Sequence, residues 1–224
     1  MTTAPPRLSE WLPAVDAALV VIAHPDDESF GLGAVLHALV TAGTPVDVLC
    51  FTHGEASTLG EAPDLGKLRK AELLAAAAKL GLRRVTLLAR PDGLLDQQPE
   101  YELDADIEGA LHDAGLLVVF EPEGVTSHPD HQAATAAGLR AAVRHSLPVL
   151  EWGVHPDIAR ALRCEFAAPF VALDGPDTVD VVVDRTAQHA AIACHQSQAH
   201  DNPILRRRLQ LQGPHERLRY HRPA

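Results

Sequence analysis

The sequence is poor in cysteine, and the few cysteines it has are placed in a way that argues against thiolate chemistry. Its three cysteines, Cys50, Cys164 and Cys194, are an odd number, lie far apart and form no CxxC pair. This pattern indicates a reducing compartment and argues against a thiolate zinc site. Buried apolar thiols are the simplest expectation.

Positive charge and long apolar runs are also scarce. Lys and Arg number 19 against 30 Asp and Glu, so the formal net charge is -11. Such a chain has no broad cationic field, and we expect neither nucleic acid nor a lipid surface as a partner. No run approaches the roughly 20 apolar residues that span a bilayer. Because residues 1–13 also lack the features of a signal peptide, we expect a cytoplasmic protein without an integral membrane segment.

The composition is that of a globular protein. The chain has 224 residues, of which 46% are hydrophobic and 22% charged, enough to build a sizeable core. No linker, internal repeat or low-complexity stretch interrupts it, so we expect one domain over residues 1–224. Thirteen histidines are the feature that stands out, because imidazole is the commonest side-chain ligand of catalytic metals.

Apolar runs alternate with amphipathic segments over the first two thirds of the chain. We expect strands at 17–23, 46–51, 85–89 and 116–120, and helices at 31–41, 67–80, 102–113 and 129–144. This alternation predicts right-handed βαβ units and an α/β, Rossmann-like three-layer fold with a mostly parallel sheet. The later part is less regular, with strands expected at 149–154, 166–173 and 179–183 and helices at 185–195 and 204–211.

Two histidine motifs follow strands of this predicted sheet. The first is His24-Pro25-Asp26-Asp27-Glu28 after the first strand, and the second is His128-Pro129-Asp130-His131 after the fourth. In such sheets the ligand site lies beyond the carboxyl ends of the strands, so both motifs are expected on the same face. In each motif proline suits the first position of a helix, where its missing N–H has no cost.

Convergence of His24, Asp27 and His131 would supply two imidazoles and one carboxylate, with a fourth position open for water. A divalent ion held there lowers the pKa of its water and polarises a carbonyl oxygen, which suits amide hydrolysis. We expect Asp26 to act as the base, and His128 to stabilise the oxyanion and protonate the leaving amine. Asp130 is expected to orient one of the histidines.

Taken singly, each motif is equally typical of a helix start, where carboxylates are favoured by the helix dipole. His155-Pro156-Asp157 repeats the first three residues but has Ile158 at the ligand position, so we interpret it as a structural turn. Gly31 and Gly33 resemble part of a dinucleotide fingerprint, but the third glycine is absent. The prediction therefore depends on both complete motifs occurring together.

The combination of AHPDDE at residues 23–28 with HPDH at 128–131 resembles the PIG-L/LmbE family of zinc-dependent N-deacetylases. Further matching segments extend the resemblance over most of the chain: 31–33, Thr52-His53-Gly54-Glu55, Arg69 with Glu72, 80–81, Asp92-Gly93 and His195-Gln196-Ser197-Gln198. The resemblance implies an LmbE-like fold and zinc bound by His24, Asp27 and His131. It further implies Asp26 as general base and His128 as acid or oxyanion stabiliser.

The same resemblance implies that Arg69 and Asp92 contact the sugar or its aglycone, although Arg69 could also be a helix-surface partner of Glu72. Family members remove acetyl groups from N-acetylglucosamine joined to inositol, malate or lipid carriers. Ser127 stands where the family commonly has glycine before HPDH, and Thr126 replaces the tyrosine of the mycothiol branch, which argues against a mycothiol-type substrate. The Arg206–Arg208 run is expected on a solvated helix face.

We therefore expect a metal-dependent hydrolase that removes an N-acetyl group from an N-acetylglucosaminyl-type small molecule. The alternatives are a zinc amidase acting on another amide, such as a thiol conjugate or a secondary-metabolite intermediate, and a non-catalytic metal-binding protein. Zn²⁺ is expected, while Fe²⁺, Co²⁺ and Mn²⁺ suit the same donors. The sequence leaves the formation of a homo-oligomer open.

Overall fold

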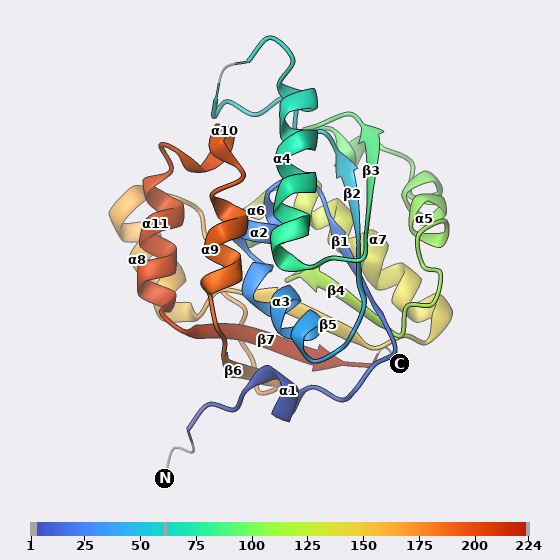
Figure 1. Ribbon diagram of the computed structural model, residues 1–224, viewed down its shortest axis with the longest axis vertical. Coiled ribbons are helices and arrows are strands. Elements are labelled where there is room, and N and C mark those ends of the chain that lie inside the picture. Colours follow the sequence, from blue (N-terminus) through green and yellow to red (C-terminus); the bar gives the residue numbers. More distant parts are fainter. Residues whose placement is uncertain (1–3, 61, 223–224) are drawn as a thin grey trace.

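The computed structural model describes residues 4–60 and 62–222. Within them, seven strands form one sheet in the order β3-β2-β1-β4-β5-β7-β6 (Figure 1). The strands are β1 (Ala18–Ile22), β2 (Val46–Thr52), β3 (Arg84–Arg90), β4 (Leu116–Phe120), β5 (Val149–Gly153), β6 (Thr178–Val182) and β7 (His215–His221). The first five are parallel, and β7 is antiparallel to both β5 and β6. The predicted α/β fold with a mostly parallel sheet is confirmed.

The central strands are buried on both faces because their side chains are almost all apolar. In β1, Val20 and Ile22 belong to one core, while Leu19 and Val21 belong to the core on the opposite face. Such continuous apolar runs are expected only where helices cover both faces of a parallel sheet.

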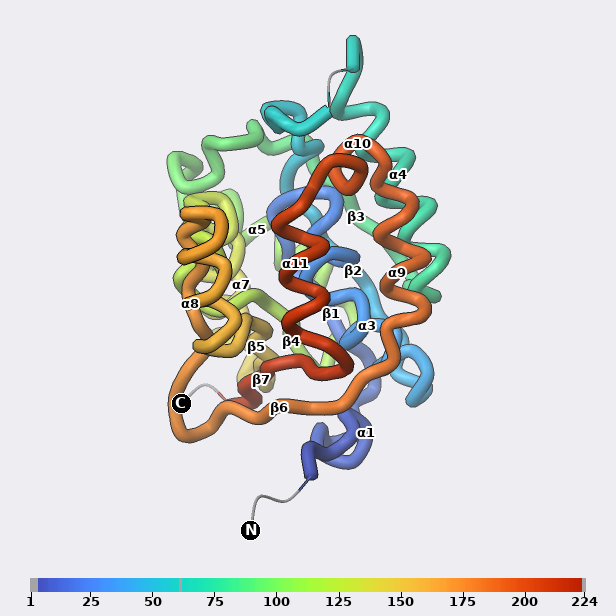
Figure 2. Tube along the Cα trace, turned by 90° about the vertical axis from the view of Figure 1, so that its left-hand side faces the viewer, coloured from blue at the N-terminus to red at the C-terminus, as the bar shows by residue number. Residues whose placement is uncertain are grey.

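Helices cover both faces of the sheet. They are α1 (Leu8–Trp11), α2 (Asp27–Phe30), α3 (Gly33–Thr41), α4 (Leu65–Leu80), α5 (Glu100–Glu108), α6 (Gly124–Ser127), α7 (Pro129–His145), α8 (Pro156–Phe166), α9 (Thr186–Ile192), α10 (Gln196–Ala199), α11 (Pro203–Gln212) and the 3-10 turn Leu95–Gln97. Helices α5 and α7 pack on one face, and α3, α8 and α11 pack on the other. Figure 2 shows α11 between α8 and α9. None of these helices combines the length and apolarity needed to cross a membrane.

The strand order places the two histidine motifs next to each other. The sheet grows from β1 toward β2 and β3 on one side and toward β4 and β5 on the other. A crevice forms outside the carboxyl ends of the strands at such a reversal. The loops that leave β1 and β4 carry His24 and His128, so both motifs open into this crevice.

The later third of the chain differs from the sequence prediction. The strand predicted at 166–173 is wrong: α8 ends at Phe166, Pro169 follows, and only Ala172 forms an isolated bridge, to Val154. The helix α8 and the strand β7 were not predicted. In β7 a charged sequence is stabilised by pairing on both sides, and the apolar content of the segment gives little sign of this. The helix predicted at 185–195 is the shorter α9.

Candidate active site and metal centre

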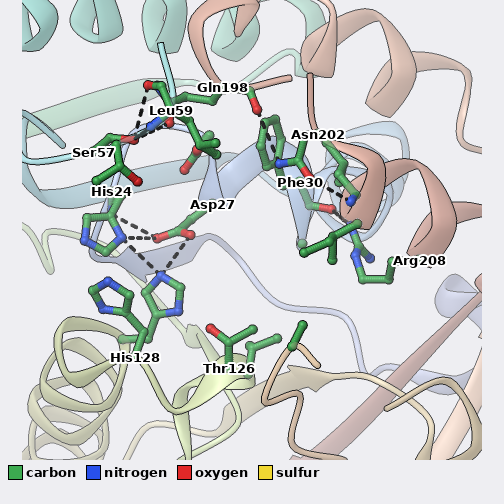
Figure 3. A pocket seen from close by; sticks show the side chains of 18 of the residues that line it. His24, Asp27, Phe30, Ser57, Leu59, Thr126, His128, Gln198, Asn202 and Arg208 are labelled. Atoms are coloured by element: carbon green, nitrogen blue, oxygen red, sulfur yellow. Dashed lines mark hydrogen bonds and ion pairs between the residues drawn. The ribbon is translucent and has the colours of Figure 1, made fainter. Parts of the chain in front are cut away.

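Three side chains bring metal-ligand atoms together at the crevice. His24 Nδ1 lies 3.1 Å from His131 Nε2, Asp27 Oδ1 lies 3.2 Å from His131 Nε2, and His24 Nδ1 lies 3.8 Å from Asp27 Oδ2. A four-coordinate zinc ion with ligands at about 2.1 Å separates its ligand atoms by about 3.4 Å. The donor set and its spacing fit a divalent metal ion (Figure 3).

Hydrogen bonds behind the donors determine which atom of each histidine faces the centre. His24 Nε2 lies 3.0 Å from Asp92 Oδ1 and 3.2 Å from Asp130 Oδ2. His131 Nδ1 lies 3.1 Å from the carbonyl of Gly124. Each of these nitrogens can donate to its oxygen, which leaves Nδ1 of His24 and Nε2 of His131 as free lone pairs. Such partners fix the tautomer that a metal requires.

The carboxylates that surround His24 also favour its protonation. Burial by itself lowers the pKa of His24, but hydrogen bonds to Asp130 and Asp92 and the charge of Asp27 outweigh burial and raise this pKa to about 10. For Asp27, burial raises the pKa, and His131 and His24 reverse this effect and hold it well below its usual range. The site thus has a strong attraction for positive charge, which a proton or a metal ion can satisfy.

Asp26 precedes the ligand Asp27 but its side chain has different partners. Its backbone has φ of 130°, a region that is costly for a residue other than glycine. Arg69 holds the Asp26 carboxylate at 3.1 Å, and Glu28 Oε2 accepts the Asp26 N–H at 3.0 Å. Burial raises the pKa of Asp26 to about 6, although Arg69 opposes the shift. A largely buried carboxylate of this kind is suited to exchange protons near neutral pH.

His128 begins α7 and faces the same pocket. Its Nδ1 accepts the N–H of Asp130 at 3.2 Å, as an N-cap does. The ring lies 4.8 Å from His24 and 5.0 Å from His131 between centroids. Burial, followed by the charges of those two histidines, lowers the pKa of His128. With Nδ1 used as an acceptor, a neutral His128 carries its proton on Nε2.

The internal comparison with His155 supports the distinction drawn from the sequence. His155 accepts the N–H of Asp157 at 3.2 Å and caps α8 just as His128 caps α7. It lines a separate depression, away from His24 and Asp27. In these two segments HPD specifies a helix start with proline at its first position, as expected. The same expectation is wrong for the first motif, because α2 begins at Asp27 and Pro25 precedes the helix.

The structure places the other predicted residues close to these three donors. Asp130 is fully buried and accepts the N–H groups of Gly93 and Leu95 in addition to its contact with His24. Asp92 contacts His24 and also lines the pocket. Arg69 is not a surface cation: it is buried, donates to the carbonyls of Gly54 and Pro25, and forms an ion pair with Asp26.

Sequence reasoning missed a buried pair behind the first motif. His195 Nε2 lies 2.7 Å from Glu28 Oε1, and both side chains are fully buried. The other oxygen of Glu28 holds the backbone of Asp26. Glu28 ends the first motif and His195 begins a matching segment, so the signal existed, but nothing in the sequence indicated that they meet.

The site opens into a pocket of about 730 Å³, a volume typical of small-molecule sites. His24, Asp27 and His128 lie at one end, and Phe30 and Arg208 lie at the other (Figure 3). A Rossmann-like sheet with a two-histidine, one-carboxylate donor set at its switch point is typical of metal-dependent hydrolases.

The chain belongs to the PIG-L family, described as GlcNAc-PI de-N-acetylase, whose model matches residues 19–142. It is 32% identical over 246 aligned residues to the 1D-myo-inositol 2-acetamido-2-deoxy-alpha-D-glucopyranoside deacetylase of Mycobacterium sp. (strain JLS), covering 86% of this chain and 76% of that protein. It is 35% identical to a probable N-acetyl-alpha-D-glucosaminyl L-malate deacetylase 2 of Bacillus subtilis (strain 168), over 56% of this chain and 60% of that protein.

Among solved structures, a triple mutant of a deacetylase from the teicoplanin biosynthetic pathway has the same fold. The TM-score is 0.70 at 20% sequence identity, with 92% of this chain and 98% of that chain covered. The resemblance to the PIG-L/LmbE family and to its fold is confirmed.

Proposed function

We propose that this protein is a metal-dependent hydrolase that removes an N-acetyl group from an N-acetylglucosaminyl-type small molecule. The convergence of His24, Asp27 and His131 at the switch point of the sheet is the observation that carries the proposal. Related proteins named as deacetylases of N-acetylglucosaminyl inositol and malate conjugates support this choice of reaction.

His24 Nδ1, Asp27 and His131 Nε2 would hold the metal, and we propose Zn²⁺ because this donor set leaves a position open. When bound, the ion lowers the pKa of water and polarises the acyl oxygen. The same donors also accept Fe²⁺, Co²⁺ and Mn²⁺. Asp130 keeps His24 oriented through its Nε2, as a carboxylate behind a metal-bound histidine commonly does.

Asp26 takes the proton of the attacking water at its carboxylate. Two interactions hold this side chain beside the pocket. Arg69 forms an ion pair with its carboxylate, and the backbone N–H of Asp26 donates to Glu28. His128 donates Nε2–H to the oxygen that becomes negative as the acyl carbon turns tetrahedral. The departing nitrogen needs one proton, which the Asp26 carboxyl group can return or His128 can supply.

Arg69 and Asp92 are proposed as substrate contacts as well, because both line the pocket. Arg69 also orients Asp26, and Asp92 also orients His24. We further propose that residues 1–224 form one domain and that the protein acts in the cytoplasm. The absence of disulfides among the described cysteines is compatible with a reducing compartment.

The test is acetate release from a panel of N-acetylglucosaminyl compounds with inositol, malate, phosphate and simple sugar aglycones. The metal-loaded protein is expected to release one acetate per amine formed from at least one of them. Release from none would reject this substrate class, and a hydrolase of a different amide would then be the better account. Acetate release that persisted fully after chelation would reject the proposed dependence on a metal ion.

A further inference from the structure

The basic run of α11 divides between the surface and the pocket. Arg206 is exposed, and Arg207 pairs with Glu165 at the surface at 2.7 Å. Arg208 is only 4% exposed and lines the same pocket as the proposed metal ligands. The sequence prediction of a solvated face is therefore wrong for Arg208, because one face of α11 packs toward the sheet.

The contacts of Arg208 are all with uncharged groups. Its guanidinium donates to Gln212 Oε1 at 2.5 Å and to the carbonyl of Phe30, and it lies 5.4 Å from the centre of the Trp152 ring. Its Nε has no acceptor among the described residues and is not one of the atoms sealed from solvent. The arginine is thus held in place and retains donor capacity.

The charge around Arg208 is not balanced. Glu216 is fully buried, but it accepts from Arg185 at 2.5 Å, from Trp152 Nε1 at 2.7 Å and from Gln212 Nε2 at 2.5 Å. In the part of the chain that the structure describes, no carboxylate lies within 4.0 Å of Arg208. Two buried guanidinium groups therefore share one carboxylate, and Arg208 is left without a carboxylate partner of its own among the described residues.

This charge persists at neutral pH and is costly without a partner. Burial lowers the pKa of Arg208 only to about 10, so the guanidinium stays protonated. An isolated buried charge is strongly disfavoured unless an opposite charge or a set of hydrogen bonds compensates it. Bidentate binding of a carboxylate or a phosphate is the interaction that a guanidinium makes best.

The walls beside Arg208 are apolar. Ile204 and Leu205 precede it by one turn of α11, and Phe30 and Phe170 also line the pocket. Aromatic contacts connect this end to the metal donors: Phe120 lies 5.4 Å from Trp152 and 5.1 Å from His131 between ring centres. Because Arg208 and the metal donors line one pocket, we expect a single ligand to contact both.

We propose that Arg208 binds a carboxylate or phosphate on the aglycone of the substrate, with an apolar group between that anion and the N-acetylated sugar. The proposal rests on the proposed function, since it names the substrate class of the same site. It predicts a preference for anionic, partly apolar aglycones over neutral polar ones such as inositol.

The test compares 4-carboxyphenyl, 4-phosphonophenyl and 4-carbamoylphenyl N-acetylglucosaminides, which differ mainly in the charge at the far end of the aglycone. For the metal-loaded enzyme, at least one of the two anionic compounds is expected to have a KM at least about tenfold below that of the neutral carbamoyl compound. Arg208→Gln should bring the ratio of the carbamoyl KM to the anionic KM to near one. A wild-type ratio near one for both anions would overturn the proposal.

The control is Arg207→Gln, which removes a neighbouring arginine of the same helix that faces the surface. It should keep the wild-type ratio, and equal loss of the ratio in both variants would contradict a specific role for Arg208. Arg208→Lys keeps the charge without the planar fork, and serves if the glutamine variant does not fold. For Arg208→Lys, the ratio of the carbamoyl KM to the anionic KM should fall below the wild-type value but stay above one. An unchanged ratio would contradict bidentate binding.

A binding measurement separates this proposal from the proposed function. Calorimetric titration of the corresponding 4-carboxyphenyl, 4-phosphonophenyl and 4-carbamoylphenyl glucosaminides requires no hydrolysis. The wild type should bind an anionic compound more tightly than the carbamoyl compound, and Arg208→Gln should abolish this difference in affinity. That result would support the anion site even if no acetate were released from any compound. Equal binding of the three compounds to the wild type would overturn the anion site, whatever the activity.

Discussion

At the scale of the residue, the site depends on hydrogen bonds that decide which atom of each side chain faces the pocket. Asp26 is the clearest case, because Arg69 and Glu28 hold it in a backbone conformation that is unusual for aspartate. Its neighbour Asp27 has other partners: it accepts the N–H groups of Ala23 and His24 and lies 3.2 Å from His131 Nε2. Two adjacent carboxylates thereby acquire different tasks.

We predict that Asp26→Asn lowers kcat by about 100-fold to 10,000-fold, the range typical of removing a general base. Metal content should stay at the wild-type level, because asparagine leaves His24, Asp27 and His131 unchanged. Steady-state kinetics and elemental analysis measure the two quantities. The matched control is Asp157→Asn, in the HPD segment away from this pocket, which should be active. Near-wild-type turnover in Asp26→Asn would remove Asp26 from the role of base.

A second prediction concerns protons released by metal binding. Because the pKa of His24 is raised to about 10, the His24 ring of the metal-free protein is doubly protonated throughout the neutral range. It then carries a proton on Nδ1 as well as on Nε2. The metal needs Nδ1 unprotonated, so binding should release about one proton, and the apparent affinity should rise about tenfold per pH unit between pH 6 and pH 8. Titration calorimetry in buffers of different ionisation enthalpy counts the proton. A flat affinity over this range would contradict the arrangement of His24.

Much of the site was predictable at this scale, because two short motifs state residue types and spacing directly. The partners that lie far apart in the sequence were not. His195 meets Glu28, and Arg208 enters the pocket, only after α9 to α11 have packed against the sheet. Helical periodicity cannot say which of three consecutive arginines faces inward.

At the scale of the element, parallel strands and their covering helices place the two motifs. Helix α7 starts at the pocket, with His128 as its N-cap, and packs over β1 and β4. This close approach needs a small residue: a Cβ atom on Gly138 would lie 2.9 Å from Val119 Cγ1. The β-branched side chain of Val119 is buried and has little freedom to move.

We predict that Gly138→Ala destabilises the protein by about 1–2 kcal/mol. Alanine favours a helix over glycine by up to about 1 kcal/mol, but overpacking of a core costs about 1–3 kcal/mol, and the steric term should win. The control is Gly109→Ala at the end of α5, where the nearest atom would lie at an ordinary 3.5 Å. Urea unfolding measures both variants. A Gly138→Ala protein as stable as the Gly109→Ala protein would contradict this packing.

Elements of the first two thirds were predicted well, since buried parallel strands are continuous apolar runs. The strand β4 has its predicted bounds, and β1 and β2 differ by a few residues at most. The last third was harder. Strand β7 lies between β5 and β6, and its charges are satisfied by neighbours such as Glu151, which pairs with Arg219. Pairing of this kind is a tertiary property that local sequence does not express.

At the scale of the whole molecule, one crevice brings together the proposed metal donors, the proposed base and an arginine without a carboxylate partner. The first part of the chain supplies the metal donors, while α11, the last helix described, supplies Arg208. The net charge of -11 does not reveal that a buried arginine in this crevice lacks a carboxylate partner within the described part of the chain. The arrangement fits the proposal that residues after β1 and β4 carry the reaction and that Arg208 of α11 adds to the selection of the substrate.

The most direct test of the central claim is acetate release measured through a cycle of metal removal and return. The wild-type protein should release acetate from an N-acetylglucosaminyl substrate when loaded with Zn²⁺, lose this activity on chelation, and regain it with about one equivalent of metal per chain. His131→Ala should bind less than a tenth of that metal and stay inactive. Full activity in the metal-free protein, or a metal-replete and active His131→Ala, would contradict the account.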